Sequence, residues 1–270
     1  MKSAVTVSLI PEARGGPFVY WDELGVACEK AKRLGFDAVE IFPPAATAVE
    51  PRYVREITDR HGLKVSSMGT GGGWVKHKLT LTSPDLAIRT RAHEFIASIV
   101  DVAGAVGAPA IVGSMQGRWT DEVTQDAARG YLTAALEELG ERAKGLGVPL
   151  LYEPLNRYET NLVTTMADGV KLLASLKTKN VKLLADLYHM NIEEGNLGAA
   201  LREAGSAVGH VHLADSNRRP AGNGHTDFAS IAQALRDINY SGYISAECFP
   251  WPDPDTAAAT TMDAIQKYFA

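Results

Sequence analysis

Short apolar segments alternate with longer amphipathic segments along the whole sequence, and this alternation limits the folds that the chain can adopt. Eight of the short segments are rich in β-branched and apolar residues, which is typical of buried parallel strands. The segments between them have helical periodicity and end near a glycine, as at 21–36, 83–108 and 120–147. The predicted strands are residues 4–10, 38–42, 64–68, 109–113, 149–153, 181–186, 209–215 and 242–247.

Eight strands, each followed by a helix, predict an α/β fold made of one (β/α)₈ TIM barrel. No linker rich in Pro or Ser interrupts the 270 residues, so we expect residues 1–270 to form a single domain. The alternative, a doubly wound open sheet, normally carries a glycine fingerprint after its first strand, but here that turn reads IPEARGG. At the start of the helix at 83–108, we expect Ser83 as the N-cap and Pro84 at the first helical position.

The composition limits the partners and the compartment. The formal net charge is −5 and lysines and arginines do not cluster, which disfavours nucleic acid and acidic membrane surfaces as partners. The first apolar run is too short for a signal peptide or a membrane span. Two cysteines without a CxxC pair are too few for a disulfide framework. These features predict a cytoplasmic protein that binds neither nucleic acid nor membrane.

Four metal-ligating side chains stand at the ends of four successive predicted strands. Glu153 ends the fifth strand, Asp186 the sixth and Glu247 the eighth, while His212 lies near the end of the seventh. The carboxyl ends of barrel strands meet at one mouth, so the four side chains can converge there. Three carboxylates and one imidazole suit one octahedral Mn²⁺, Mg²⁺ or Co²⁺ ion. Each acid alone could cap a helix or pair with an arginine, but a cation would remove the repulsion among three of them.

Further polar side chains follow the same strands. His189 lies on the turn after the sixth strand and Arg218 follows the seventh, and we expect both to face the mouth. Glu159 and Arg157 follow the fifth strand, and His225 lies on the long loop after the seventh. For Arg157 and His225, a solvated loop position is as good an interpretation as a place in the site.

Two histidines of the seventh strand, His210 and His212, are two residues apart and therefore point the same way. Imidazoles in a buried strand need hydrogen-bond partners or a ligand. His212 is nearer the rim and is the candidate ligand. We expect His210, one layer lower, to be a hydrogen-bonded core residue or a support for the ligands.

The motifs around these residues resemble those of a known family. EPLNRYET at 153–160, ADLYHMNIEE at 185–194, HVHLADSNRRPAGNGHTDF at 210–228 and SAEC at 245–248 are together similar to the xylose isomerase-like TIM barrel superfamily, in particular to ketose 3-epimerases of the D-tagatose 3-epimerase type. The resemblance covers nearly the whole chain. It implies a homodimer or homotetramer that acts on a small sugar.

The resemblance also implies roles for individual residues. The ligands of one divalent metal ion, with Mn²⁺ the foremost candidate, would be Glu153, Asp186, His212 and Glu247. The substrate would be bound by Glu159, His189 and Arg218. Glu153 and Glu247 would be the catalytic acid/base pair, because removal of a proton next to a ketone on one face and its return on the other inverts C3. A metal would stabilise the enolate that forms between these steps.

The first half of the chain departs from the best-known ketohexose enzymes of this type. The loop after the third strand reads MGTGGGWVKHKLTLTSPD, and the turn after the fourth reads GSMQGRW. This version resembles a branch that acts on keto-sugar acids such as 5-ketogluconate and tagaturonate. Arg118 could bind a substrate carboxylate through two parallel hydrogen bonds, or it could be a surface arginine before the next helix. The substrate stays open between neutral ketoses and keto-sugar acids.

Other activities use the same scaffold. An aldose-ketose or hydroxypyruvate isomerase differs in the carbon that receives the proton, and a keto-inositol dehydratase would expel water from the enolate. A phosphodiesterase of the endonuclease IV type needs additional histidines where this chain has SSMGT and VGSMQ. A sugar-binding barrel without activity would be expected to lose one of the acids, and none is missing here.

Overall fold

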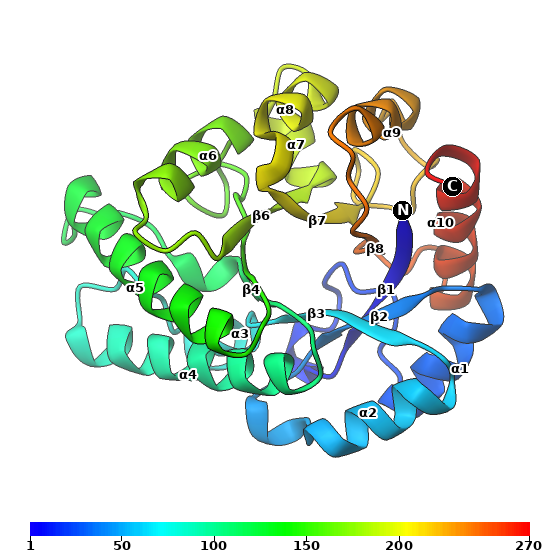
Figure 1. The fold of residues 1–270 in the computed structure, drawn as a ribbon, viewed down its shortest axis with the longest axis horizontal. Helices are drawn as coiled ribbons and strands as arrows, with labels where there is room; N and C mark the ends of the chain where they lie inside the picture. The colour runs from blue at the N-terminus through cyan, green and yellow to red at the C-terminus, as the bar shows by residue number, and fades with distance from the viewer.

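In the computed structural model, which describes residues 1–270, eight parallel strands form a closed barrel (Figure 1). Neighbouring strands pair in sequence order, and β1 pairs with β8 to close the sheet. This confirms the TIM barrel that the sequence predicts. The strands are β1 Lys2–Ser8, β2 Ala38–Phe42, β3 Lys64–Gly69, β4 Ala110–Val112, β5 Leu150–Tyr152, β6 Val181–Asp186, β7 Val208–Leu213 and β8 Tyr243–Ala246.

Helices surround the barrel as an outer ring (Figure 1). Two short helices, α3 and α7, lie between a strand and the longer helix that packs on the barrel, so both belong to the mouth side of their repeats. The helices are α1 Leu24–Leu34, α2 Pro51–Arg60, α3 Gly72–His77, α4 Leu86–Ala105, α5 Gln125–Gly145, α6 Met166–Ser175, α7 Leu187–Glu193, α8 Leu197–Ala204, α9 Phe228–Asp237 and α10 Pro254–Tyr268. Short 3₁₀ turns lie at Pro11–Ala13, Ala46–Ala48, Ser114–Gln116 and Gly205–Ala207.

The hydrophobic residues divide into two cores, as the barrel geometry requires. The main core of 70 buried residues fills the space between the strands and the helix ring. A smaller core inside the barrel consists of Ile10, Phe42, Ile111, Leu151 and Leu184. Because side chains fill the interior, the barrel is a packed support for its mouth and not a channel.

The glycines that end three predicted helices have the conformation expected of them. Gly35, Gly107 and Gly147 have φ of 86°, 74° and 76°, which is the left-handed region that glycine adopts at no steric cost. The predicted start of α4 was wrong by two residues. Asp85 is the N-cap, since its Oδ1 accepts from Ala87 N at 2.7 Å, while Ser83 Oγ accepts only from the backbone of Asp85.

None of the helices combines the length and the apolar character that would let it cross a lipid bilayer.

Candidate active site at the barrel mouth

The four predicted ligands meet at the carboxyl ends of β5 to β8. His212 Nδ1 lies 3.7 Å from Glu153 Oε1, 3.6 Å from Asp186 Oδ2 and 3.4 Å from Glu247 Oε2. All four side chains are buried, with between 1% and 7% of each residue exposed. Four strand ends far apart in the sequence therefore bring three carboxylates and one imidazole to a single point.

Asp186 uses its two carboxylate oxygens for different purposes. Oδ1 caps helix α7 by accepting from Tyr188 N at 2.8 Å and His189 N at 3.2 Å. Oδ2 faces the cluster and lies 3.5 Å from the Arg218 guanidinium. Burial raises the pKa of Asp186, but the groups that face it, His189, Arg218 and His212, outweigh burial and bring the pKa below its usual range. The residue caps a helix and keeps one ionised oxygen in the site.

Glu153 follows β5 and packs against the backbone of the neighbouring β4 turn. A Cβ on Gly113 would lie 2.3 Å from Glu153 Oε2, so only glycine leaves room for this carboxylate. Burial raises the pKa of Glu153 well above its usual range, and repulsion from Glu247 and Asp186 acts in the same direction. Without a cation, the cluster therefore favours a proton on Glu153.

His212 has its two ring nitrogens in different surroundings. Nε2 lies 2.8 Å from Glu40 Oε1, while Nδ1 is buried with no hydrogen-bond partner. Because a carboxylate only accepts, Nε2 carries a proton. Burial lowers the pKa of His212, but Glu40, Glu247 and Asp186 outweigh burial and raise the pKa well above its usual range, so a divalent cation would replace a second proton at Nδ1. An unpaired buried nitrogen beside three carboxylates fits a divalent cation, and ligand atoms of Glu153, Asp186 and His212 lie within 4.8 Å of one another.

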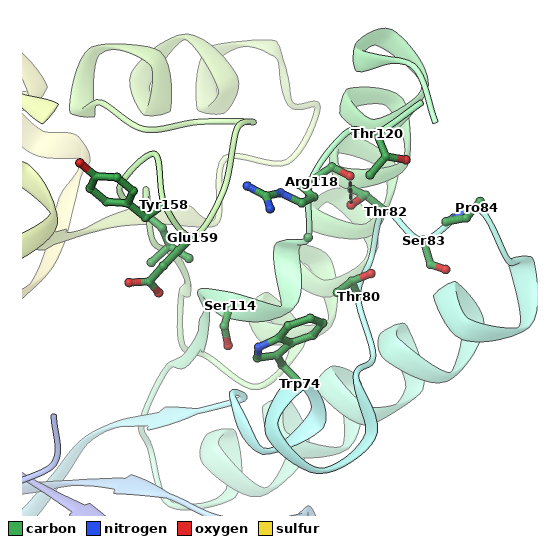
Figure 2. A pocket seen from close by; sticks show the side chains of 12 residues that line it. Trp74, Thr80, Thr82, Ser83, Pro84, Ser114, Arg118, Thr120, Tyr158 and Glu159 are labelled. Carbon is green, nitrogen blue, oxygen red and sulfur yellow. Dashed lines mark hydrogen bonds between the residues drawn. The ribbon is translucent and has the colours of Figure 1, made fainter. Parts of the chain in front are cut away.

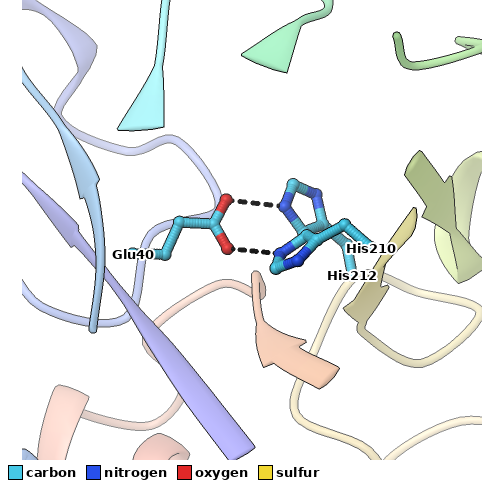
Figure 3. Close-up of side chains that lie close together, drawn as sticks. All are labelled: Glu40, His210 and His212. Carbon is cyan, nitrogen blue, oxygen red and sulfur yellow. Dashed lines mark hydrogen bonds and ion pairs between the residues drawn. The ribbon is translucent and has the colours of Figure 1, made fainter. Parts of the chain in front are cut away.

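Glu40 is a residue that the sequence reasoning missed. It lies within β2, is fully buried, and binds His210 Nε2 and His212 Nε2 with one oxygen each, both at 2.8 Å (Figure 3). The expectation of a hydrogen-bonded core position for His210 is confirmed. The available signal was an acid inside a strand that should be apolar, in the sequence AVEIF.

Hydrogen bonds to Nδ1 orient the His189 ring so that its Nε2–H is free to donate to a bound small molecule. Its Nδ1 accepts from Asn156 N at 3.2 Å and lies 2.7 Å from Asn156 Nδ2. The proton is therefore on Nε2, which faces Glu153 Oε1 at 3.9 Å and Asp186 Oδ2 at 3.7 Å. Burial lowers the pKa of His189, so the ring stays neutral near pH 7.

Arg218 reaches the cluster from the loop after β7. Nη2 donates to Glu247 Oε2 at 2.7 Å, and the guanidinium lies over the Tyr188 ring, 4.6 Å from its centroid. Nη1 lies 3.8 Å from Glu159 Oε1. The backbone of Arg218 is left-handed, with φ of 58°, which a non-glycine residue adopts only when its surroundings hold it there. The arginine is thus a fixed positive charge at the edge of the carboxylate cluster.

A cavity of about 350 Å³ opens above the cluster. Its polar lining includes Glu153, Glu159, His189, Arg218 and Glu247. Leu155, after β5, adds one apolar residue to this lining. The other apolar residues come from the first half of the barrel and are Ile10, Ala13, Pro17, Phe18, Phe42, Trp74, Val75 and Ile111. A few convergent polar groups in a largely apolar pocket are typical of a small-molecule site.

Arg118 does not join this cluster. It lines an adjoining chamber of about 440 Å³, which shares Trp74, Ser114, Leu155 and Glu159 with the first cavity. Figure 2 shows the Arg118 side chain extending across this chamber, towards the side where Tyr158 and Glu159 stand. Its guanidinium makes no ion pair, unlike that of Arg157, which pairs with Glu193 at 2.9 Å. His225 is exposed and lines neither chamber.

Known proteins share this architecture and sequence. A family model described as "Xylose isomerase-like TIM barrel" matches residues 28–268. A D-psicose 3-epimerase of Agrobacterium fabrum is 32% identical over 246 residues, covering 86% of this chain and 83% of the relative. A 3-dehydro-D-guloside 4-epimerase of Escherichia coli is 31% identical and covers 80% of this chain and 83% of the relative.

The structural likeness extends over almost the entire chain. The crystal structure of a D-allulose 3-epimerase from Methylomonas sp., in complex with D-allulose, superposes with a TM-score of 0.82 at 26% identity, covering 99% of this chain and 98% of that one. The chain therefore belongs to the xylose isomerase-like TIM barrel family, and its named relatives are epimerases, enzymes of the isomerase class.

Proposed function

We propose that the chain is a metal-dependent epimerase that inverts C3, next to the ketone, of a ketose or keto-sugar acid. The observation that carries this proposal is the convergence of Glu153 and Glu247 on one buried atom, His212 Nδ1, at 3.7 and 3.4 Å. Epimerisation needs two acid/base groups at one carbon, one for each face. Relatives named D-psicose 3-epimerase and L-ribulose 3-epimerase support the choice of carbon.

The side chains at the barrel mouth would have three different roles in this reaction. A divalent ion, with Mn²⁺ the foremost candidate, would be held by Glu153, Asp186, His212 and Glu247, and would withdraw charge from the ketone so that the adjacent C–H becomes acidic. One glutamate then takes the proton from one face and the other returns a proton to the opposite face. His189 Nε2–H and the Arg218 guanidinium donate to sugar oxygens and fix the reacting carbon between the two acids.

The adjoining chamber supports a substrate with an acidic end. Arg118 offers an unpaired guanidinium there, and a carboxylate at the far end of an open sugar chain would satisfy it through two hydrogen bonds. Neutral ketoses leave this arginine without a partner. We therefore favour keto-sugar acids such as 5-ketogluconate or tagaturonate over neutral ketohexoses.

A second candidate is epimerisation at C4 of a keto-glycoside. The chamber offers hydroxyl groups from Thr80 and Ser114 and the partly exposed ring of Trp74, a lining suited to a second sugar unit. The Escherichia coli relative named 3-dehydro-D-guloside 4-epimerase supports this reading.

Proton exchange with solvent tests the function directly. The Mn²⁺-loaded enzyme is incubated in D₂O with fructose, ribulose, 5-ketogluconate, tagaturonate and a 3-keto-glycoside, and the products are examined by NMR. Deuterium on the hydroxyl-bearing carbon next to the ketone, which is C3 of a ketose, in a product inverted at that carbon is the expected result. Deuterium at C4 of the keto-glycoside selects the second candidate, deuterium at the former carbonyl carbon indicates an isomerase, and an unsaturated product indicates a dehydratase. No exchange with any substrate overturns the enolate mechanism.

The substitution Arg118→Leu tests whether the enzyme binds keto-sugar acids in preference to neutral ketoses. We expect KM for the keto-sugar acid to rise at least tenfold while KM for a neutral ketose is unchanged, because only the acid uses the guanidinium. Arg219→Leu is the matched control, since Arg219 is exposed, lies against Trp251 and lines neither chamber. Equal effects of Arg118→Leu on both substrate classes contradict the carboxylate contact.

A further inference from the structure

Glu40 lies in a place where a charged group is costly. It is fully buried in the middle of β2, where both neighbouring strands also present buried residues, Thr6 on β1 and Ser67 on β3. Removal of a carboxylate from water without compensating partners costs several kcal/mol, on the order of the Born penalty reduced by relaxation. A leucine or valine would fill this position without that cost. The acid is therefore expected to serve something other than barrel stability.

The partners of Glu40 show what it serves. Both oxygens accept from imidazole Nε2 atoms, Oε2 from His210 and Oε1 from His212, each at 2.8 Å (Figure 3). Ser67 Oγ approaches His210 Nε2 only at 3.5 Å. Glu40 is thus the one strong hydrogen-bond partner of His212 on the side that faces away from the carboxylate cluster.

The hydrogen bond between His212 Nε2 and Glu40 Oε1 decides which ring nitrogen of His212 can offer a lone pair to a cation. A neutral imidazole has one N–H and one lone pair, and the hydrogen bond made by one nitrogen fixes the other. With Nε2–H held by Glu40, the nitrogen that can offer its lone pair to a cation is Nδ1, the atom that has no partner and lies within 3.7 Å of three carboxylates. The negative charge of Glu40 also makes the ring a stronger electron donor.

We propose that Glu40 is a positioning residue of the metal site, which fixes His212 as its Nε2–H tautomer and so presents Nδ1 to the cation. The proposal rests on the metal site of the proposed function. His210 Nε2 occupies the second carboxylate oxygen at 2.8 Å, so both oxygens of Glu40 are held by imidazoles. Glu40 itself does not contact the substrate cavity, since it is absent from the residues that line it.

Metal binding to the metal-stripped enzyme, measured without substrate, tests this. In Glu40→Gln, the amide can present either its oxygen or its NH₂ to His212, so both tautomers become accessible and the charge is lost. We expect the dissociation constant for Co²⁺, followed by its visible absorption, to rise about 10- to 100-fold. Ser67→Ala is the matched control, because Ser67 contacts His210 and not His212, and it should bind Co²⁺ like the wild type.

A double substitution separates positioning from a general loss of structure. In a His212→Ala background, Glu40→Gln should change Co²⁺ affinity by less than threefold, because the ring through which it acts is gone. A tenfold or larger further loss in that background overturns the proposal, as does a folded Glu40→Gln single variant that binds Co²⁺ within threefold of the wild type.

The tautomer can be read in the wild-type chain if Glu40→Gln does not fold. Nitrogen-15 NMR of the Zn²⁺-bound enzyme should show a protonated Nε2 and a metal-shifted Nδ1 for His212, and the reverse pattern overturns the proposal. Neither measurement involves turnover. A failure of the D₂O exchange with normal metal binding would thus refute the proposed reaction and leave this inference standing.

Discussion

At the residue scale, the two proposed acid/base groups stand in different surroundings. Glu153 lies against Gly113, and burial, together with repulsion from its carboxylate neighbours, raises its pKa well above the usual range. Glu247 accepts a hydrogen bond of 2.7 Å from Arg218. Unlike surroundings around two carboxyl groups are how one site holds an acid and a base at the same pH. Without a cation, the arrangement favours a proton on Glu153 while Arg218 pairs with Glu247.

Glu247→Gln is expected to abolish turnover while the fold is retained. The amide keeps the size of the side chain and can still accept from Arg218, but it cannot take or return a proton, so kcat should fall by about 10²- to 10⁴-fold. The rate is measured by product formation, and folding by circular dichroism and thermal melting. Glu193→Gln, which changes an acid paired with Arg157 outside the cluster, should keep the wild-type rate. A wild-type rate in Glu247→Gln refutes its acid/base role.

The sequence predicts the strand-end residues of the site because their positions follow from one rule. Each of Glu153, Asp186 and Glu247 ends a strand or directly follows one, and a barrel brings such ends together. The same rule cannot find Glu40, which lies inside β2 and meets His212 across 172 positions of sequence. The rule also cannot predict that Arg118 lines the adjoining chamber and not the cavity above the cluster. The path of the loop that carries Arg118 depends on tertiary packing.

At the element scale, the loop between β7 and α9 is held by one acid. Asp215 is almost fully buried, and its carboxylate accepts from the backbone N–H groups of Ser216, Gly222 and Thr226 at 2.8, 2.8 and 3.1 Å. Its own carbonyl accepts from Arg218 N at 2.8 Å. These contacts keep Arg218 in its left-handed conformation and aim its side chain at the cluster.

Removal of the Asp215 carboxylate is expected to loosen this loop. Asp215→Ala leaves three backbone N–H groups without their acceptor, so the free energy of unfolding should fall by about 2–3 kcal/mol. KM should rise as well, because Arg218 loses its fixed position. Asp263→Ala, an exposed change on α10, is the control and should stay within about 0.5 kcal/mol of the wild type. Urea unfolding and steady-state kinetics measure the two effects.

The stability lost in Asp215→Ala should become smaller as the pH falls into the acid range. Burial raises the pKa of Asp215, but the backbone N–H groups outweigh it and hold the pKa below the ordinary value of 3.8. A lowered pKa in the folded state contributes stability above the unfolded value, and this contribution disappears as the pH falls through the folded value. The difference between wild type and Asp215→Ala should therefore narrow in acid below pH 3.8. A difference that stays constant there would show that the carboxylate charge is not its cause.

The number and order of the elements were predictable, while several of their ends were not. All eight strands overlap their predicted ranges, because a buried parallel strand is marked by its apolar run. The strands β4 and β5 are only three residues long, and each lacks one residue at both ends of its predicted range. The N-cap of α4 is Asp85 and not Ser83, because Asp85 Oδ1 accepts from the helix N–H of Ala87 while Ser83 Oγ reaches only Asp85 N.

At the scale of the whole molecule, the closed barrel concentrates negative charge on one side of its mouth. β5 to β8 are consecutive neighbours, so the acids of Glu153, Asp186 and Glu247 all fall within reach of His212. Arg218 is the single guanidinium that pairs with this cluster. One positive charge against three carboxylates leaves an excess that a divalent ion would balance, which links metal binding to the stability of the entire fold.

Removal of the metal is therefore expected to lower the melting temperature without unfolding the chain at 25 °C. A ligand at about 100 times its Kd adds about 2.7 kcal/mol, and about 1 kcal/mol shifts Tm by about 2–4 °C in a chain of this class, so Mn²⁺ should raise Tm by about 5–10 °C over the chelator-treated protein. The variant Asp186→Asn is the comparison that isolates the metal site. The amide oxygen of the new side chain can still cap α7, as Asp186 Oδ1 does, but the substitution removes the charge of one metal ligand. The Mn²⁺-dependent shift in this variant should fall to less than half of the wild-type shift. Equal shifts in both proteins would place the bound ion elsewhere, and no shift in the wild type would contradict a metal site at this mouth.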